Sequence, residues 1–171
     1  MPMQIHLEKP SRRRRDEFLQ AVRNSKSLHG KWTSAPGTTA EFDALLKRLR
    51  QKTHLGYWII TEQDELAGAI HVSEIVRGSF CSAYLGYYAF APHNGRGYMT
   101  QGLSAVVSDA FHHQGLHRLE ANIQPGNHAS RALVQGLGFR LEGISPRYLK
   151  IAGRWRDHER WAITIEEWKK K

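Results

Sequence analysis

The fold of this chain follows from the stretch Tyr84-Leu85-Gly86-Tyr87-Tyr88-Ala89-Phe90-Ala91-Pro92-His93-Asn94-Gly95-Arg96-Gly97-Tyr98-Met99-Thr100. Its apolar first half predicts a strand, and the apolar residues that recur at helical spacing from Met99 onward predict a helix. Between them, Gly95 and Gly97 allow a tight turn and a close approach of a ligand to the backbone. The free N–H groups of the helix would point into this turn. The pattern predicts a site for a phosphate-bearing cofactor, although an ordinary strand-to-helix turn has the same glycines.

A second strand and helix follow further along the chain. The strand His117–Ile123 is halted by Pro125-Gly126, and the segment that begins at Asn127 has the pattern of a helix. Asn127 is a suitable N-cap, and a glycine ends the helix before Phe139 opens the next strand.

The glycine loop and the later motif Asn-x-x-Ser-x-x-Leu-x-x-x-Leu-Gly-Phe, from Asn127 to Phe139, resemble the GNAT superfamily of acyl-CoA N-acetyltransferases. The segment Tyr148-Leu149-Lys150-Ile151-Ala152-Gly153-Arg154-Trp155-Arg156-Asp157-His158 resembles the ribosomal-protein alanine N-acetyltransferases, the RimJ/RimL-type branch. The resemblance covers nearly the whole chain and is strongest from Tyr84 to Trp168. It implies the GNAT fold and acetyl-CoA as the acetyl donor.

The remaining elements can be predicted from local patterns. They are a strand at Gln4–Leu7, a helix from Ser11 (its cap) to about Asn24, a loop at Trp32–Gly37, a helix opened by the capping box Thr38-Thr39-Ala40-Glu41, a hairpin of Tyr57–Thr61 with Leu66–Ile75, and two last strands around Ala152-Gly153. We expect an α/β protein with one central, mostly antiparallel mixed sheet of about seven strands, flanked by about four helices. Residues 1–171 are expected to form a single domain.

The charge of the chain favours anionic partners. Lys and Arg number 25 against 16 Asp and Glu, a net charge of +9. The run Arg12–Arg15 is interpreted as a solvated helix face, because four consecutive helical residues point in different directions. No nucleic-acid-binding motif accompanies the charge, so specific nucleic-acid binding is not expected, while association with a ribosome stays open.

Other compositional features suggest where the protein works. Cys81 is the only cysteine, so an intramolecular disulfide is impossible and a reducing compartment is favoured. The sequence has no signal-peptide pattern and no segment long enough to span a membrane, so we expect a cytoplasmic monomer or homodimer. The histidines show no metal-ligand spacing, and no metal is expected.

The resemblance assigns the cofactor contacts residue by residue. The backbone from Gly95 to Thr100 should hold the pyrophosphate of acetyl-CoA, and the end of the preceding strand should offer backbone groups to pantetheine and to the developing oxyanion. Asn127 should bridge the cofactor and its helix, or act only as a cap. The full set is Tyr87, Tyr88, Ala89, Asn94, Gly95, Arg96, Gly97, Tyr98, Met99, Thr100 and Asn127.

The position expected for the general base, which would take a proton from the acceptor amine, departs from the family pattern. Asn122 stands where several relatives have a basic glutamate, and an amide cannot take a proton. Glu120, two residues earlier on the same strand face, could act through a water or could pair with a nearby arginine. A protein α-amine has a pKa near ~7.8, against ~10.4 for lysine, and therefore needs less help from a base.

The position expected for the general acid also departs from the family pattern. Val134 stands where many relatives have a tyrosine. The RimL-type enzymes use a serine of this helix, which corresponds to Ser130, and a hydroxyl that hydrogen-bonds the sulfur is sufficient for a thiol leaving group. Tyr148 is the other candidate, or an aromatic residue that packs in the core. The expected function is acetylation of a protein N-terminal amine. The alternatives are a small-molecule amine as acceptor, or a non-catalytic CoA- or RNA-binding module.

Overall fold

The computed structural model describes residues 4–168, which build one seven-stranded sheet in the order β1-β2-β3-β4-β5-β7-β6. Neighbouring strands are antiparallel except β4 and β5, which are parallel. The strands are β1 (Ile5–Glu8), β2 (Leu55–Thr61), β3 (Leu66–Val76), β4 (Ser82–Ala89), β5 (Arg118–Ile123), β6 (Arg140–Ile151) and β7 (Arg154–Thr164). The prediction of a mostly antiparallel mixed sheet is therefore confirmed.

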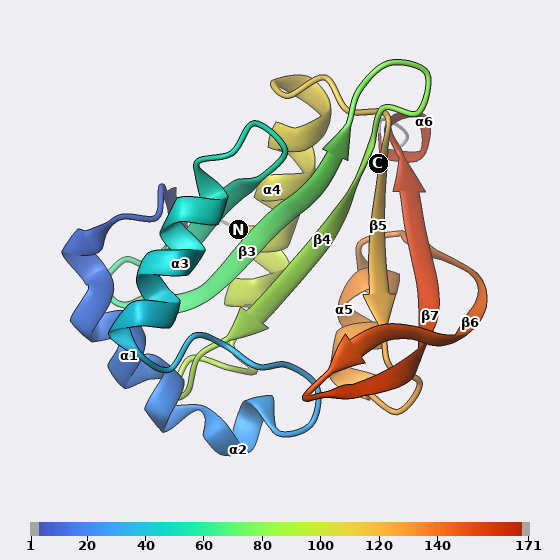
Figure 1. The fold of residues 1–171 in the computed structure, drawn as a ribbon. Helices are drawn as coiled ribbons and strands as arrows, with labels where there is room; N and C mark the ends of the chain where they lie inside the picture. Colours follow the sequence, from blue (N-terminus) through green and yellow to red (C-terminus); the bar gives the residue numbers. More distant parts are fainter. Residues whose placement is uncertain (1–3, 169–171) are drawn as a thin grey trace.

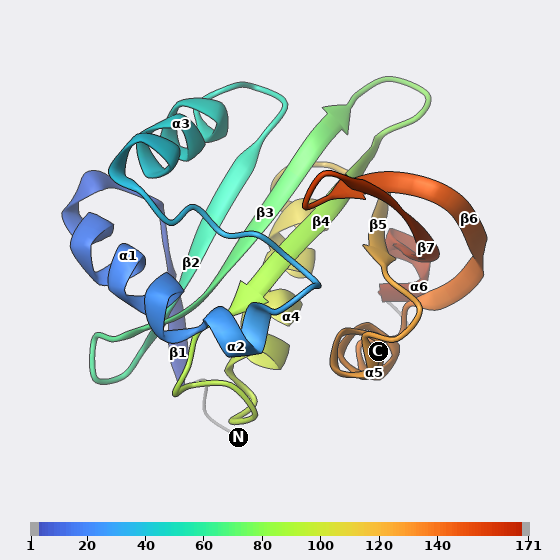
Figure 2. The same ribbon diagram turned by 60° about the horizontal axis from the view of Figure 1, so that its bottom comes forward.

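Helices cover both faces of this sheet. The helical elements are η1 (Arg12–Arg14), α1 (Arg15–Asn24), α2 (Lys26–His29), α3 (Thr39–Leu49), α4 (Tyr98–His112), α5 (His128–Gly136) and α6 (Ile165–Trp168). The α1–α3 segment lies on one face, and α4 lies on the other (Figures 1 and 2). The four long helices were predicted. The prediction missed α2 and α6, because each has only four residues and so no periodic pattern. None of the helices in residues 4–168 is long and apolar enough to cross a membrane.

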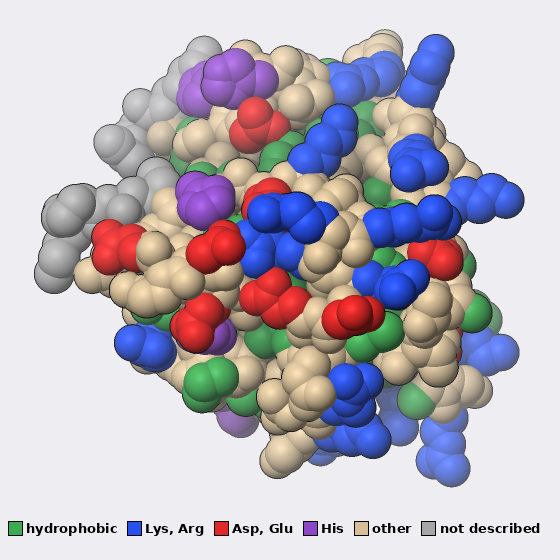
Figure 3. Space-filling view, turned by 90° about the vertical axis from the view of Figure 1, so that its left-hand side faces the viewer, with side chains coloured by type: hydrophobic (Ala, Val, Ile, Leu, Met, Phe, Trp, Pro, Cys, Tyr) green, Lys and Arg blue, Asp and Glu red, His purple; other side chains and the backbone are tan. Residues whose placement is uncertain are grey.

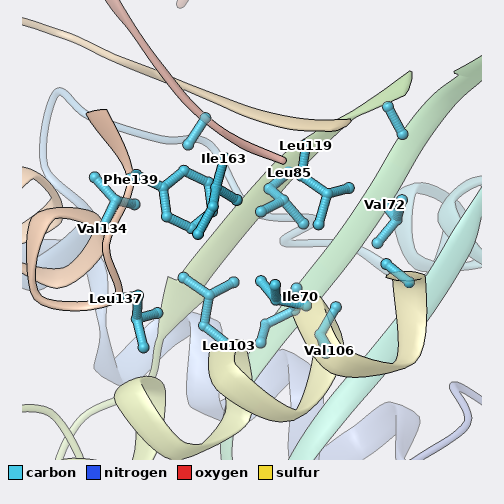
Figure 4. Close-up of a cluster of buried hydrophobic side chains, with 14 of the residues drawn as sticks. Ile70, Val72, Leu85, Leu103, Val106, Leu119, Val134, Leu137, Phe139 and Ile163 are labelled. Carbon is cyan, nitrogen blue, oxygen red and sulfur yellow. The ribbon is translucent and has the colours of Figure 1, made fainter. Parts of the chain in front are cut away.

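A separate apolar cluster fills the space on each side of the sheet. On the α4 and α5 side, side chains from β3, β4 and β5 meet those of both helices (Figure 4). On the other side, Phe18 of α1 and Phe42 of α3 pack on Trp58 of β2, and all three are fully buried. Odd and even residues of β4 thus serve different cores, because side chains of a strand alternate between its faces.

The capping box of α3 is confirmed. The Thr38 hydroxyl accepts from the N–H of Glu41, and the Glu41 carboxylate accepts from the N–H of Thr38. Two donors at this helix end are thereby satisfied. The prediction that Ser11 caps the first helix was wrong: its side chain makes no cap hydrogen bond, and the chain enters through the 3-10 turn η1 instead.

The interpretation of the arginine run was also wrong for one member. Arg12 and Arg13 are largely exposed and the Arg15 side chain is 40% exposed, but the Arg14 side chain is only 5% exposed. Its guanidinium group is paired with the carboxylates of Glu8, Glu17 and Asp64. Local sequence could not reveal this, because Asp64 comes from the distant β2–β3 turn. On the face that Figure 3 shows, which is the left-hand side of Figure 1, basic side chains lie among acidic ones.

Candidate functional site

The site begins where β4 and β5 part. Their parallel pairing runs from Ser82 with Arg118 to Leu85 with Ala121 and then stops. β4 nevertheless continues to Ala89 and β5 to Ile123, so the ends of the two strands are not paired with each other. The sheet therefore has an opening at its centre, bordered by backbone groups that are not paired across it.

Alternation decides which backbone groups border this opening. The Tyr88 carbonyl faces β3, where it would come within 3.1 Å of a β-carbon placed on Gly68. The polar groups of Tyr87 and Ala89 consequently point the other way, toward β5. The Ala89 carbonyl already accepts a hydrogen bond from Nε2 of His29, at 2.8 Å. Of the three predicted strand-end residues, Tyr87 and Ala89 thus direct backbone groups to the opening, and Tyr88 does not.

The glycine loop leads from β4 into the start of α4. Gly95 and Gly97 have φ angles of 76° and 81°, and a β-carbon on either would meet no atom within 4 Å. Gly97 is the N-cap of α4, and no side chain caps this end in the described part of the chain. The first N–H groups of α4 are thus placed to bind an anion. Arg96 adds a cation whose guanidinium carbon lies 5.4 Å from the ring centre of Tyr98.

The other predicted residues of the loop divide by exposure. Asn94 and Thr100 are exposed, and Tyr98 is buried. The half-buried Met99 packs toward β3, where its sulfur would lie 2.6 Å from a β-carbon on Gly68.

The start of α5 brings two hydroxyl groups together. The Asn127 side chain accepts from the N–H of Ser130 at 3.3 Å, so Asn127 caps α5. The Ser130 hydroxyl in turn lies 2.7 Å from that of Tyr87 on β4. Burial raises the pKa of Tyr87 to about 12, so this phenol is neutral at pH 7 and either hydroxyl can donate the hydrogen bond.

The other predicted catalytic residues lie on the opposite face of the sheet. Glu120 is buried, and its Oε1 accepts from two nitrogen atoms of Arg118, at 3.0 and 2.9 Å. Half-buried Tyr148 of β6 contacts Tyr84 of β4, and this hydrogen-bonding contact raises the pKa of Tyr84 to about 12. The structure therefore brings Glu120 and Tyr148 to one side of the opening and Ser130 to the other.

Three features of the site were not predicted. They are the Tyr87 hydroxyl beside Ser130, the exposed Gly86 in the middle of β4, and His71 of β3, which pairs with Gly86 in the sheet register. Period-two alternation could have placed Tyr84, Gly86 and Tyr88 on one face. The position of His71 depends on the register between β3 and β4, which is not visible in a single sequence. No cluster of three potential metal ligands occurs within residues 4–168.

Comparison with known proteins shows the family to which this chain belongs. A model of the acetyltransferase (GNAT) domain matches residues 4–140. The chain belongs to the GNAT acetyltransferase family. A probable N-acetyltransferase of Bacillus subtilis, YjcK, is 38% identical over 68% of this chain and 65% of its own length. The ribosomal protein uS5-alanine N-acetyltransferase of Escherichia coli is 39% identical over 63% of this chain.

A solved structure extends the likeness to nearly the whole chain. Mycobacterium smegmatis RimJ, in complex with CoA-disulfide, has a TM-score of 0.86 and 28% sequence identity, and the match covers 95% of this chain and 83% of that protein. The chain spans less of the two curated relatives named above, 65% of the first and 55% of the second.

Proposed function

We propose that this GNAT protein is an acetyl-CoA-dependent N-acetyltransferase that acetylates a protein N-terminal α-amine, of the ribosomal-protein alanine type. The observation that carries the proposal is the opening between β4 and β5, which lies beside the uncapped start of α4. An elongated donor can lie with its phosphates at the helix and its reactive end in the opening. The relatives named for alanine acetylation support the choice of acceptor.

The glycine loop fits the phosphate end of acetyl-CoA. Gly95 and Gly97 leave open space for a phosphate group, and the first-turn N–H groups of α4 would bind it together with Arg96. Asn94 and Thr100 are exposed at the rim of the same loop. Acetyl-CoA would supply the acetyl group as a thioester, and the backbone groups of Tyr87 and Ala89 would orient it in the opening.

The acceptor amine needs little help from a base. Asn122 cannot take a proton, and Glu120 is held by Arg118, so we assign Glu120 a positioning role. An α-amine with a pKa near ~7.8 is neutral in roughly a tenth of its molecules at pH 7, whereas a lysine side chain is almost fully charged. This difference favours an N-terminal acceptor.

Ser130 is the proposed donor to the leaving sulfur. As the bond between carbon and sulfur breaks, negative charge grows on the sulfur, and a hydroxyl hydrogen bond strengthens with that charge. Tyr87 can donate its own hydrogen to Ser130 Oγ, which leaves the serine hydrogen free for the sulfur. Val134 is buried in the core and has no such role.

The experiment incubates the protein with acetyl-CoA and three acceptors: an alanine-initiated peptide, the same peptide with a blocked N-terminus and a free lysine, and spermidine. We expect thiol release and a mass increase of one acetyl group for the first peptide only. Transfer only to lysine or spermidine would favour a small-amine enzyme. Tight acetyl-CoA binding without any transfer would favour a non-catalytic module.

The charge of the protein supports a ribosomal acceptor. A net charge of +9 raises the rate of encounter with an anionic surface such as ribosomal RNA, with no need for base-specific contacts. We propose that residues 1–171 act as one domain, as a monomer or homodimer.

A further inference from the structure

A basic hollow lies at the surface of the molecule, between η1 and α3. It has a volume of about 450 Å³, and its lining residues are Arg12, Asp43, Ala44, Leu46, Lys47 and Arg50. Asp43, Lys47 and Arg50 are spaced three or four residues apart, so they lie along one side of the helix and its end. Arg12 reaches the same hollow from η1. Three cations from two separate segments therefore meet at one place.

The positive charge of this hollow is largely free to bind a ligand. Asp43 is the one acid among the lining residues, and its Oδ1 lies 3.3 Å from Nε of Arg12. The Arg12 side chain is 71% exposed, so the pair leaves its terminal nitrogen atoms open to solvent. Lys47 and Arg50 are exposed, and neither makes an ion pair with a residue of the described range 4–168. The hollow thus offers three cations against one carboxylate that is already paired.

The end of a helix accounts for only part of this cluster. The dipole of α3 favours cations at its C-terminal end, where Lys47 and Arg48 lie in the last turn. It does not account for Arg12, which the packing of η1 brings to the same hollow. Arg13 on η1 and Lys52 beyond α3 are also exposed. On the right-hand half of Figure 3, basic side chains gather beyond the acidic ones, so the positive surface is larger than a single phosphate needs.

The chemistry of the hollow suits a phosphate backbone better than a protein surface. Interfaces between proteins usually have an apolar centre. Within the described chain, the large apolar side chains that are exposed belong to α2, β3, the β3–β4 turn, β6 and β7, and none belongs to η1 or α3. Leu46, on the floor of the hollow, is buried. Arginine and lysine side chains are the usual contacts of proteins to nucleic-acid phosphates.

We propose that the hollow between η1 and α3 binds the phosphate backbone of RNA without reading its sequence. No aromatic side chain lines the hollow to stack on a base. A phosphate site here goes beyond the proposed function, because acetyl transfer does not need it, whereas the choice of RNA over DNA rests on the proposed ribosomal acceptor. α3 lies on the sheet face that carries Glu120 and Tyr148, so bound RNA would keep this face toward the ribosome (Figure 2).

The test compares two double variants of equal net charge. Lys47→Gln/Arg50→Gln removes two cations of the hollow. Lys150→Gln/Arg154→Gln is the matched control, because it removes two exposed cations of the β6–β7 hairpin. Each variant lowers the net charge of +9 by two. A labelled RNA hairpin is titrated with each protein by fluorescence anisotropy at several salt concentrations, and acetylation of the alanine-initiated peptide is measured without RNA.

We expect RNA affinity to fall at least about fivefold in the hollow variant and less than about twofold in the control. The slope of log affinity against log salt should become shallower by about 1–2 in the hollow variant, because two phosphate contacts are lost. Peptide acetylation should be the same in both variants, because neither pair lies in the cofactor loop or the opening.

Equal losses of RNA affinity in the two variants would mean that net charge alone attracts RNA, and would overturn the proposal. Absence of RNA binding to the wild-type protein would overturn it too. Tighter binding of poly-glutamate, or of a DNA hairpin of the same sequence, would assign the hollow to an acidic protein or to DNA and would equally overturn it. The expected RNA results without any peptide acetylation would refute the proposed function and leave the phosphate site standing.

Discussion

The hydroxyl of Tyr87 on β4 lies 2.7 Å from the hydroxyl of Ser130 on α5, and the two residues are 43 positions apart in sequence. β4 brings the phenol to the edge of the opening, and the Asn127 cap fixes the first turn of α5 that carries the serine. The site thereby gains a tyrosine hydroxyl on the α5 side of the sheet, although α5 itself has Val134 at the position where the family resemblance leads us to expect a tyrosine.

Ser130→Ala should lower kcat by about tenfold and leave acetyl-CoA affinity nearly unchanged, because the lost contact strengthens only as charge develops on the sulfur. Tyr87→Phe should have a smaller effect of the same kind. Steady-state kinetics and calorimetry on both variants check this. If Tyr148→Phe lowers kcat more than Ser130→Ala does, the proton donor lies on the other face of the sheet.

Gly97→Val should weaken acetyl-CoA binding at least about tenfold, or about 1.4 kcal/mol, because a branched side chain would fill the space over the start of α4. The φ of 81° also strains any side chain at this position. Gly78→Val is the matched control: Gly78 has a φ of 73° and open space around its β-carbon, but lies in the β3–β4 turn. Equal acetyl-CoA affinities of the two folded variants, by calorimetry, would remove the loop from the cofactor site.

Glu120→Gln should keep the wild-type dependence of rate on pH, because Arg118 already occupies the carboxylate. With an alanine peptide, both proteins should rise in rate with pH and level off near ~8, at the pKa of the acceptor itself. Initial rates from pH 6 to pH 9 check this. A loss of rate in the variant that is confined to pH values below 8 would restore Glu120 as a base that acts through water.

Acid should destabilise the fold partly through Glu142. A hydrogen bond from Arg118 holds the pKa of Glu142 at about 2, below its ordinary value of 4.5. The unfolded chain therefore binds this proton first, so the stabilisation is complete above pH 4.5 and is lost as the pH falls toward 2. Urea unfolding at pH 7 and pH 3 should show a smaller acid loss of stability in Glu142→Gln than in wild type. Equal losses would contradict this assignment.

Arg14→Ala should reduce the free energy of unfolding by more than about 1 kcal/mol, because the buried guanidinium group pairs with the mostly buried Glu8 as well as with the more exposed Glu17 and Asp64. Arg13→Ala, at an exposed neighbour that pairs with Glu8, should cost about 0–1 kcal/mol. Urea unfolding at pH 7 compares the two variants. Similar costs would mean that the buried network contributes little.

Local patterns in the sequence were sufficient for most elements of the fold. The strand before Pro92, the helix after Gly97 and the capping box at Thr38 depend on residues close together in the chain, so their backbone preferences act without distant partners. Elements of a single turn, such as α2, carry too few residues for a periodic signal. The cofactor roles of Gly95 to Thr100 stay predictions, since they came from resemblance and await binding data.

The sequence by itself determined that this chain forms an α/β protein with a glycine loop before a helix, because hydrophobic period and glycine conformation are local properties. Only the tertiary structure decided that Arg14 is buried, that Tyr87 meets Ser130, and that Gly86 lies open beside His71 and Asn122. Each of these depends on which strands lie side by side and in what register. That choice follows from burying both faces of the whole sheet at once, and no single segment specifies it.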